Sequence, residues 1–139
     1  RELSSGKVYY YANTTGSSYG SRTQVGTGFK GVSTFTLDYD ADGRMDLVAR
    51  TKTGTGQLKL YRSNGSGRFI SEPRKVIRTS GWNKMIHLSS ITNHLGDGGQ
   101  GILARESSGN LRYFKVTRNK VHAGAYIGRG GWETLRLGS

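Results

Sequence analysis

The sequence of 139 residues contains no cysteine and a single proline. Without cysteine, neither disulfides nor a thiol nucleophile can contribute to stability or function. A small domain without disulfides often needs another stabilising element, such as a metal ion or association with further copies. No apolar run approaches the roughly 20 residues that span a bilayer. We therefore expect no membrane span and look for a metal site.

Acidic residues are also scarce, with 9 Asp and Glu against 21 Lys and Arg and a formal net charge of +12. Such an excess either keeps a protein soluble or attracts polyanions such as nucleic acid, teichoic acid, acidic polysaccharide or anionic lipid. The densest basic cluster on one expected strand consists of Arg74, Lys75 and Arg78. No helix-turn-helix or other nucleic-acid motif is present, which disfavours nucleic acid as the partner.

Glycine is frequent, with 22 residues, and marks an internal repeat of about 50 residues. Three segments align on Gly6, Gly56 and Gly109: SSGKVYYYAN, GTGQLKLYRSN and SSGNLRYFKV. The segments KVYYYA and QLKLYR alternate between the two faces of a strand, and Gly-rich turns suit hairpins. No segment shows convincing helical periodicity. The pattern predicts short antiparallel strands in a repeated unit.

A period of this length is in the range of propeller blades. We predict an all-β fold of about three propeller-type blades, each a four-stranded antiparallel sheet, in a single repeat domain over residues 1–139. The expected divisions are a partial blade at 1–31, blades at 32–83 and 84–132, and a closing strand at 133–139. Closed propellers typically have four to eight blades. We therefore expect a homo-oligomer or a part of a larger propeller.

One short segment, DYDADGRMDL, holds four of the nine acidic residues. Alternate carboxylates in a tight loop converge on one point and repel each other without a cation. Ca²⁺ prefers six to eight oxygen ligands, and Gly43 permits the sharp turn. An EF-hand is disfavoured because Ala49 stands where a bidentate Glu is needed and both flanks are expected strands. The segment predicts one Ca²⁺ site formed by Asp38, Asp40, Asp42, the carbonyl of Arg44, and Asp46. The alternative is an Asx-rich turn with solvated carboxylates.

A second loop, Asn93–Gly101, lies at the same place in the repeat. It retains Asp97 and Gly98 but has Gly101 where the first loop has Asp46. Of the positions equivalent to the four aspartates of the first loop, only Asn93 and Asp97 could offer side-chain oxygens, so we expect this loop to hold no metal.

The unit formed by the acidic loop, LVAR, S-G-x-L-x-x-Y, G-S-G-x-F and a terminal Gly-aromatic pair resembles the FG-GAP or VCBS-type repeats of secreted actinobacterial proteins. Those repeats are similar to the calcium-loop blades of integrin α-subunit propellers. The resemblance implies propeller blades with Ca²⁺ at Asp38, Asp40, Asp42, the Arg44 carbonyl and Asp46. It also implies a secreted, extracellular protein, although the chain opens with Arg1 and Glu2 and shows no signal peptide. Such modules accompany secreted hydrolases or act as adhesive and lectin-like domains.

No catalytic motif accompanies this pattern. There is no G-x-S-x-G element, no phosphate-binding loop, and no pair of carboxylates outside the acidic loop. We therefore expect no enzymatic activity and predict a calcium-stabilised binding module, lectin-like or adhesive toward glycans or cell-wall polymers. Its candidate ligand-binding residues are Trp82, Trp132, Arg74, Lys75 and Arg78.

Several alternatives remain open. Phe29, Trp82 and Trp132 occupy equivalent repeat positions, and the simpler expectation is that they pack between blades. The chain could instead be a protein-interaction or inhibitor domain, a basic effector that binds polyanions or nucleic acid, or an accessory domain of a secreted hydrolase.

Overall fold

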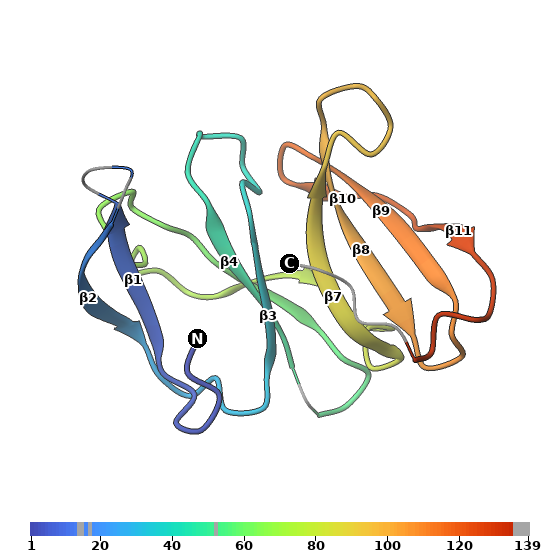
Figure 1. Cartoon of the computed structure of the whole chain (residues 1–139), viewed down its shortest axis with the longest axis horizontal. Coiled ribbons are helices and arrows are strands. Elements are labelled where there is room, and N and C mark those ends of the chain that lie inside the picture. The colour runs from blue at the N-terminus through green and yellow to red at the C-terminus, as the bar shows by residue number, and fades with distance from the viewer. Residues whose placement is uncertain (14–15, 17, 52, 135–139) are drawn as a thin grey trace.

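The computed structural model describes residues 1–13, 16, 18–51 and 53–134. Within these ranges the chain forms eleven strands and no helix, and every strand pair is antiparallel (Figure 1). The expectation of an all-β, antiparallel fold is confirmed. The strands form three sheets that follow one another along the chain and lie side by side.

The first sheet is a hairpin of β1 (Val8–Asn13) and β2 (Tyr19–Gly26). The second sheet is a meander whose four strands are β3 (Ser33–Leu37), β4 (Asp46–Arg50), β5 (Leu58–Tyr61) and β6 (Lys75–Arg78). The third sheet contains β7 (Met85–Thr92), β8 (Gln100–Glu106), β9 (Leu111–Thr117), β10 (Lys120–Val121) and β11 (Ala125–Gly128).

The third sheet differs from the expected four strands because two short strands share the outer edge of β9. Lys120 pairs with Thr117, and Ala125 pairs with Tyr113. Asn119 adopts a left-handed φ of 60° between β9 and β10, and asparagine tolerates this conformation better than most residues. The chain can therefore reverse directly after β9. Residues 135–139 of the predicted closing strand lie outside the described ranges, and Glu133 and Thr134 are in a turn.

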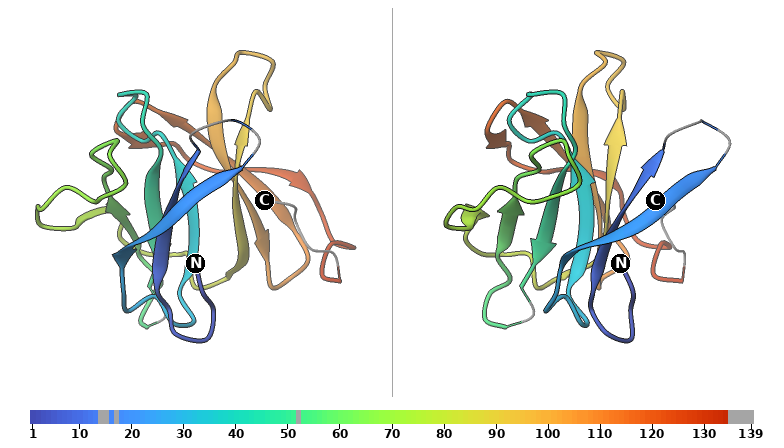
Figure 2. Two further views of the ribbon diagram at one scale, coloured as in Figure 1. Left: turned by 60° about the vertical axis from the view of Figure 1, so that its left-hand side comes forward. Right: turned by 90° about the vertical axis from the view of Figure 1, so that its left-hand side faces the viewer.

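The three sheets stand next to one another in the further views of the ribbon (Figure 2). Two clusters of buried apolar side chains form the cores between them. Strand β4 contributes to both, because successive side chains of a strand point to opposite faces. Leu47 and Ala49 pack with Val8 and Phe29 near the first sheet, whereas Val48 packs in the core that contains Ile102 of the third sheet. This burial on two faces explains the nearly continuous apolar sequence of β4.

Equivalent contacts recur where each sheet meets the next segment. The Arg1 guanidinium donates to the carbonyl of Phe29 at 3.2 Å, and Arg50 donates to the carbonyl of Trp82 at 3.3 Å. Arg105 donates to the carbonyl of Glu133. One arginine per unit thus binds a carbonyl at the Gly-aromatic pair: that of the aromatic residue itself for Arg1 and Arg50, and that of the next residue for Arg105.

Glycine is required at two of the positions on which the repeats align, because the backbone directly after the Gly-aromatic pair approaches closely there. Gly6 and Gly56 have φ values of 69° and 72°, which favour glycine. A Cβ atom would approach the backbone nitrogen of Lys30 to 2.1 Å at Gly6, and that of Asn83 to 2.2 Å at Gly56. The repeated glycine therefore permits a close backbone approach that a larger residue would block.

Candidate metal centre

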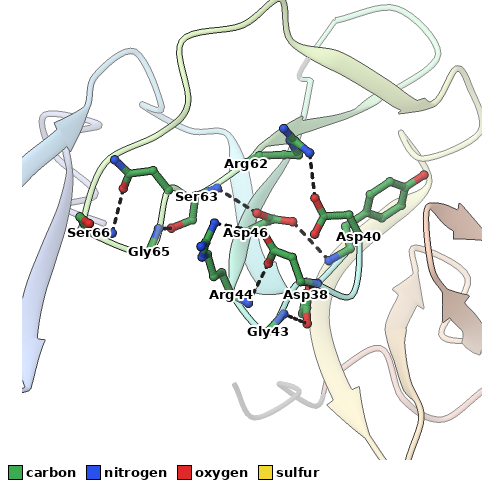
Figure 3. Close-up of polar contacts among 12 residues, drawn as sticks. Asp38, Asp40, Gly43, Arg44, Asp46, Arg62, Ser63, Gly65 and Ser66 are labelled. Carbon is green, nitrogen blue, oxygen red and sulfur yellow. Dashed lines mark hydrogen bonds and ion pairs between the residues drawn. The ribbon is translucent and has the colours of Figure 1, made fainter.

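The acidic loop connects β3 to β4 and is organised by its own first carboxylate (Figure 3). The amide of Asp42 donates to Asp38 Oδ1 at 3.0 Å, and the amide of Gly43 donates to Asp38 Oδ2 at 2.9 Å. Gly43 has a φ of 83°, which is the left-handed conformation expected at the sharp turn. Arg44 donates its amide to Asp42 Oδ1 at 2.9 Å. These bonds close the loop into a compact turn.

Three carboxylates converge inside this turn. Asp38, Asp40 and Asp42 each offer an oxygen, and these oxygens all lie within 4.8 Å of one another. Two oxygens bound to one Ca²⁺ lie at most about 5 Å apart, because each Ca–O distance is about 2.3–2.6 Å. The spacing of the three carboxylates therefore suits a shared Ca²⁺ ion.

Asp40 provides the clearest sign of an incomplete site. It is only 8% exposed, and its Oδ1 atom is buried without a hydrogen-bond partner among the described residues. Leaving a buried carboxylate oxygen unpaired is costly, because the lost hydration is not replaced. A cation between the three carboxylates would supply the missing partner, so the donor set fits a hard divalent ion.

Arg62, at the end of β5, holds the other oxygen of Asp40. Its Nη1 lies 2.9 Å from Asp40 Oδ2, and its Nε donates to Glu72 Oε1 at 3.0 Å. The hydrogen bond to Glu72, followed by the field of that carboxylate and the bond to Asp40, raises the pKa of Arg62 above its usual value. Arg62 fixes the orientation of Asp40 and offsets part of the charge of the cluster.

Asp46, the fourth predicted carboxylate ligand, is not part of this cluster. It is 1% exposed, its Oδ1 accepts the amide of Ser63 at 2.9 Å, and its Oδ2 accepts the amide of Tyr39 at 3.3 Å. Burial raises the pKa of the Asp46 carboxyl above its usual value, although the two amide bonds oppose that shift. The structure therefore places Asp46 as a brace between the loop and the end of β5. The carbonyl of Arg44 stays a predicted ligand.

The second loop, Asn93–Gly101, repeats two of the hydrogen bonds from backbone amides to side-chain oxygens that occur in the first loop. Gly98 donates its amide to Asn93 Oδ1 at 2.7 Å, and Gly99 donates its amide to Asp97 Oδ1 at 2.9 Å. A third contact differs: Lys115 Nζ lies 2.6 Å from Asp97 Oδ2. Lys115 aligns with Arg62 in the repeat. The single carboxylate of the second loop is thus paired with an ammonium group of the chain itself. That this loop holds no metal stays a prediction.

We predict that replacing Lys115 with methionine raises the pKa of Asp97. The hydrogen bond from Lys115 holds the pKa of Asp97 below its usual value in the folded protein. A carboxyl whose pKa is lowered on folding adds stability above its unfolded-state pKa, and this stability is lost as the pH falls through the folded-state value. A carboxyl-detected NMR titration measures the shift directly. Lys120→Met is the matched control, and an unchanged Asp97 titration in Lys115→Met would refute the ion pair.

The candidate ligand-binding residues do not form one surface. Trp82 is 1% exposed, and the centroid of its ring lies 4.6 Å from that of the Phe114 ring in the core. Its ring is therefore not accessible to a ligand. Trp132 is 37% exposed. The two aromatic residues differ in this way because the third sheet follows Trp82 and covers it.

The basic residues near β6 are also divided between two faces. Arg74 lies over the ring of Tyr61, which packs against the core near the first sheet. Lys75 lies over the ring of Tyr39, which belongs to the core between the second and third sheets. Arg78 lines a separate hollow together with Arg112. Within β6, Lys75 and Arg78 are three positions apart and so point to opposite faces, whereas Arg74 precedes the strand. A cluster in sequence is therefore not a cluster in space.

Sequence reasoning missed the roles of Arg62 and Lys115. Both belong to the 21 Lys and Arg residues, and their composition alone gives no reason to single them out. The sequence does hold a signal for these roles. Arg62 and Lys115 occupy equivalent positions in the repeat, and each follows the loop of its own unit.

Among the described residues there is no helix long and apolar enough to cross a membrane. Comparison of the chain with protein-family models, with curated protein sequences and with solved structures finds no significant match.

Proposed function

We propose that the Asp38–Asp46 loop binds Ca²⁺ and that the bound ion stabilises a non-catalytic binding module. Two observations carry this proposal: the Oδ1 of Asp40 is buried without a hydrogen-bond partner in the part of the chain that the structure describes, and a carboxylate oxygen of Asp40 lies within 4.8 Å of oxygens of Asp38 and Asp42. Three carboxylates close together favour a cation strongly, and oxygen-only ligands favour a hard ion such as Ca²⁺.

In this proposal Asp38, Asp40 and Asp42 hold the ion and the Arg44 carbonyl adds a further oxygen. When bound, the ion supplies positive charge that cancels the mutual repulsion of the three carboxylates. Asp46 keeps the loop in place by accepting the amides of Tyr39 and Ser63. The loop then joins β3 to β4 in a single conformation. Extracellular fluid, where calcium is abundant, suits a modest site of this kind, so we propose a secreted protein.

The units are proposed to be propeller-type blades of the FG-GAP or VCBS kind. Two observations support this: the meander of β3 to β6, and the arginine and glycine contacts that recur from one unit to the next. Further units of the same kind, from another copy or from a longer chain, would complete the ring.

The binding role is proposed to be lectin-like, toward glycans or cell-wall polymers. Aromatic surface suited to the apolar faces of sugars lies at the third sheet, where Tyr126 and Trp132 are 44% and 37% exposed. The guanidinium carbons of Arg112 and Arg129 lie 5.0 and 4.5 Å from the centroid of the Tyr126 ring. The two guanidinium groups add hydrogen-bond donors beside the ring.

Calcium is expected to bind with a dissociation constant of about 0.1–1 mM, as in extracellular modules. At ten times that concentration, linkage predicts a stabilisation of about 1.4 kcal/mol. Titration calorimetry gives the affinity, and thermal unfolding with calcium or with a chelator gives the stabilisation. Asp38→Ala and Asp42→Ala should abolish both signals.

Asp97→Ala is the matched control, because it removes a carboxylate from the equivalent second loop. It should leave the calcium response intact. If Asp38→Ala bound calcium and were stabilised by it as much as the unaltered chain, the proposed site would be refuted.

A polyanion is the second candidate ligand, and the charge distribution favours it specifically. Five of the nine acidic residues already lie within 4.0 Å of a basic group, whereas the net charge is +12. Most of the described Lys and Arg residues outside these pairs are exposed, so they are available to a polyanion. Binding to a phosphate polymer that disappears at about 0.5 M salt indicates this mode, since released counterions drive it. Glycan binding that survives the same salt indicates the lectin-like mode.

A further inference from the structure

Gln100, the first residue of β8, contacts the acidic loop from the neighbouring sheet. The amide of Asp38 donates to Gln100 Oε1 at 3.0 Å, and Gln100 Nε2 donates to the carbonyl of Asp38. One side-chain amide therefore satisfies both backbone groups of Asp38. The two residues are 62 positions apart in sequence, so the bond joins the second sheet to the third.

The next residue of the loop is held by another part of the third sheet. The amide of Asn119 donates to the carbonyl of Tyr39 at 2.8 Å, and the Tyr39 hydroxyl donates to the carbonyl of Asn119 at 2.7 Å. Tyr39 is 3% exposed, whereas Asn119 is exposed, so the hydroxyl bond between them is partly shielded from water. Two consecutive loop residues, Asp38 and Tyr39, are thus each fixed at two points by the third sheet.

The position of Asp38 decides the shape of the whole loop. Its carboxylate accepts the amides of Asp42 and Gly43, which bend the chain so that Asp42 returns toward Asp38. The metal-facing carboxylates belong to the second sheet, yet the backbone that carries the first of them is fixed by the third sheet. Holding ligands in place before an ion binds reduces the ordering cost of binding.

We propose that Gln100 is a positioning residue for the metal site and that docking of the third sheet and calcium binding promote each other. This inference rests on the proposed calcium site. Coupling of two binding events is reciprocal, so a contact that raises calcium affinity must itself be strengthened by calcium. Gln100 supplies the contact at Asp38, and the hydroxyl of Tyr39 supplies the contact at Asn119.

Gln100→Ala tests the first half of the inference. We expect its calcium dissociation constant, measured by calorimetry with calcium chloride, to rise about tenfold, a typical size for such coupling. Tyr39→Phe keeps the ring and removes the hydroxyl, and should weaken calcium binding in the same direction. Gln24→Ala, at an exposed position of β2, is the matched control and should bind as the unaltered chain does.

Hydrogen exchange at the amide of Asn119 tests the reciprocal half. Calcium should slow this exchange in the unaltered chain and slow it less in Gln100→Ala, an effect that general destabilisation would not produce. If Gln100→Ala does not fold, Tyr39→Phe carries both comparisons.

The possible failures are distinct. An unaltered chain that binds no calcium removes the site itself, and the coupling with it. An unaltered chain that binds calcium while Gln100→Ala and Tyr39→Phe bind it equally well overturns the coupling alone. Calcium binding without any change in Asn119 exchange also overturns the coupling.

Discussion

Replacing Trp82 with alanine is expected to remove about 3–5 kcal/mol from the free energy of unfolding. The Trp82 side chain is 1% exposed and lies in the core between the second and third sheets, in contact with the ring of Phe114. Truncation leaves a cavity lined by side chains from both sheets, and the surroundings collapse only partly into it. Because small domains are stable by only about 5–15 kcal/mol, urea unfolding should show a large shift in midpoint.

Trp132→Ala is the control, since Trp132 has the equivalent repeat position but is 37% exposed. Its loss of stability should be clearly smaller. Phe29→Ala, at the third equivalent position and only 4% exposed, should resemble Trp82→Ala more closely. Equal losses for Trp82→Ala and Trp132→Ala would contradict the assignment of Trp82 to an inter-sheet core.

The strands were predictable because their signals are local. Alternating side chains in QLKLYR and glycines at turns encode β5 and its flanks without reference to the rest of the chain. The division of the outer edge of the third sheet into β10 and β11 was not predictable. Strand β10 has only two residues, too few for any periodicity, and its existence depends on the left-handed turn at Asn119.

Replacing Asp46 with alanine is the second change with a large expected effect. The carboxylate is 1% exposed and accepts two backbone amides, from Tyr39 and Ser63. Its removal leaves two donors without partners, and each buried unsatisfied donor costs about 1–3 kcal/mol. We expect a loss of about 2–6 kcal/mol in the free energy of unfolding, measured with a chelator present so that no metal contributes.

The comparison with Asp97→Ala separates a bracing role from simple loss of charge. Asp97 is an exposed carboxylate in the equivalent second loop, so its removal should cost little. Asp46→Asn retains one acceptor oxygen and should fall between the two. If Asp46→Ala were as stable as the unaltered chain in chelator, Asp46 would not act as a brace.

The candidate site was partly predictable for similar reasons. Asp38, Asp40 and Asp42 lie in one tight loop, and their closeness in sequence is a local signal that their side chains come together. The role of Asp46 depends on register: it pairs with Leu37, which is fully buried, so its side chain faces the interior. Gln100 reaches the loop from 62 residues away, and no local pattern predicts such a contact.

Crystals grown with calcium, measured at a long X-ray wavelength for anomalous scattering, test the central claim most directly. The expected result is one strong anomalous peak about 2.3–2.6 Å from oxygens of Asp38, Asp40 and Asp42. Asp40 Oδ1 should be among those oxygens. A map with no peak there, and with Asp40 Oδ1 bonded to water or protein alone, would contradict the claim that this loop holds a metal ion.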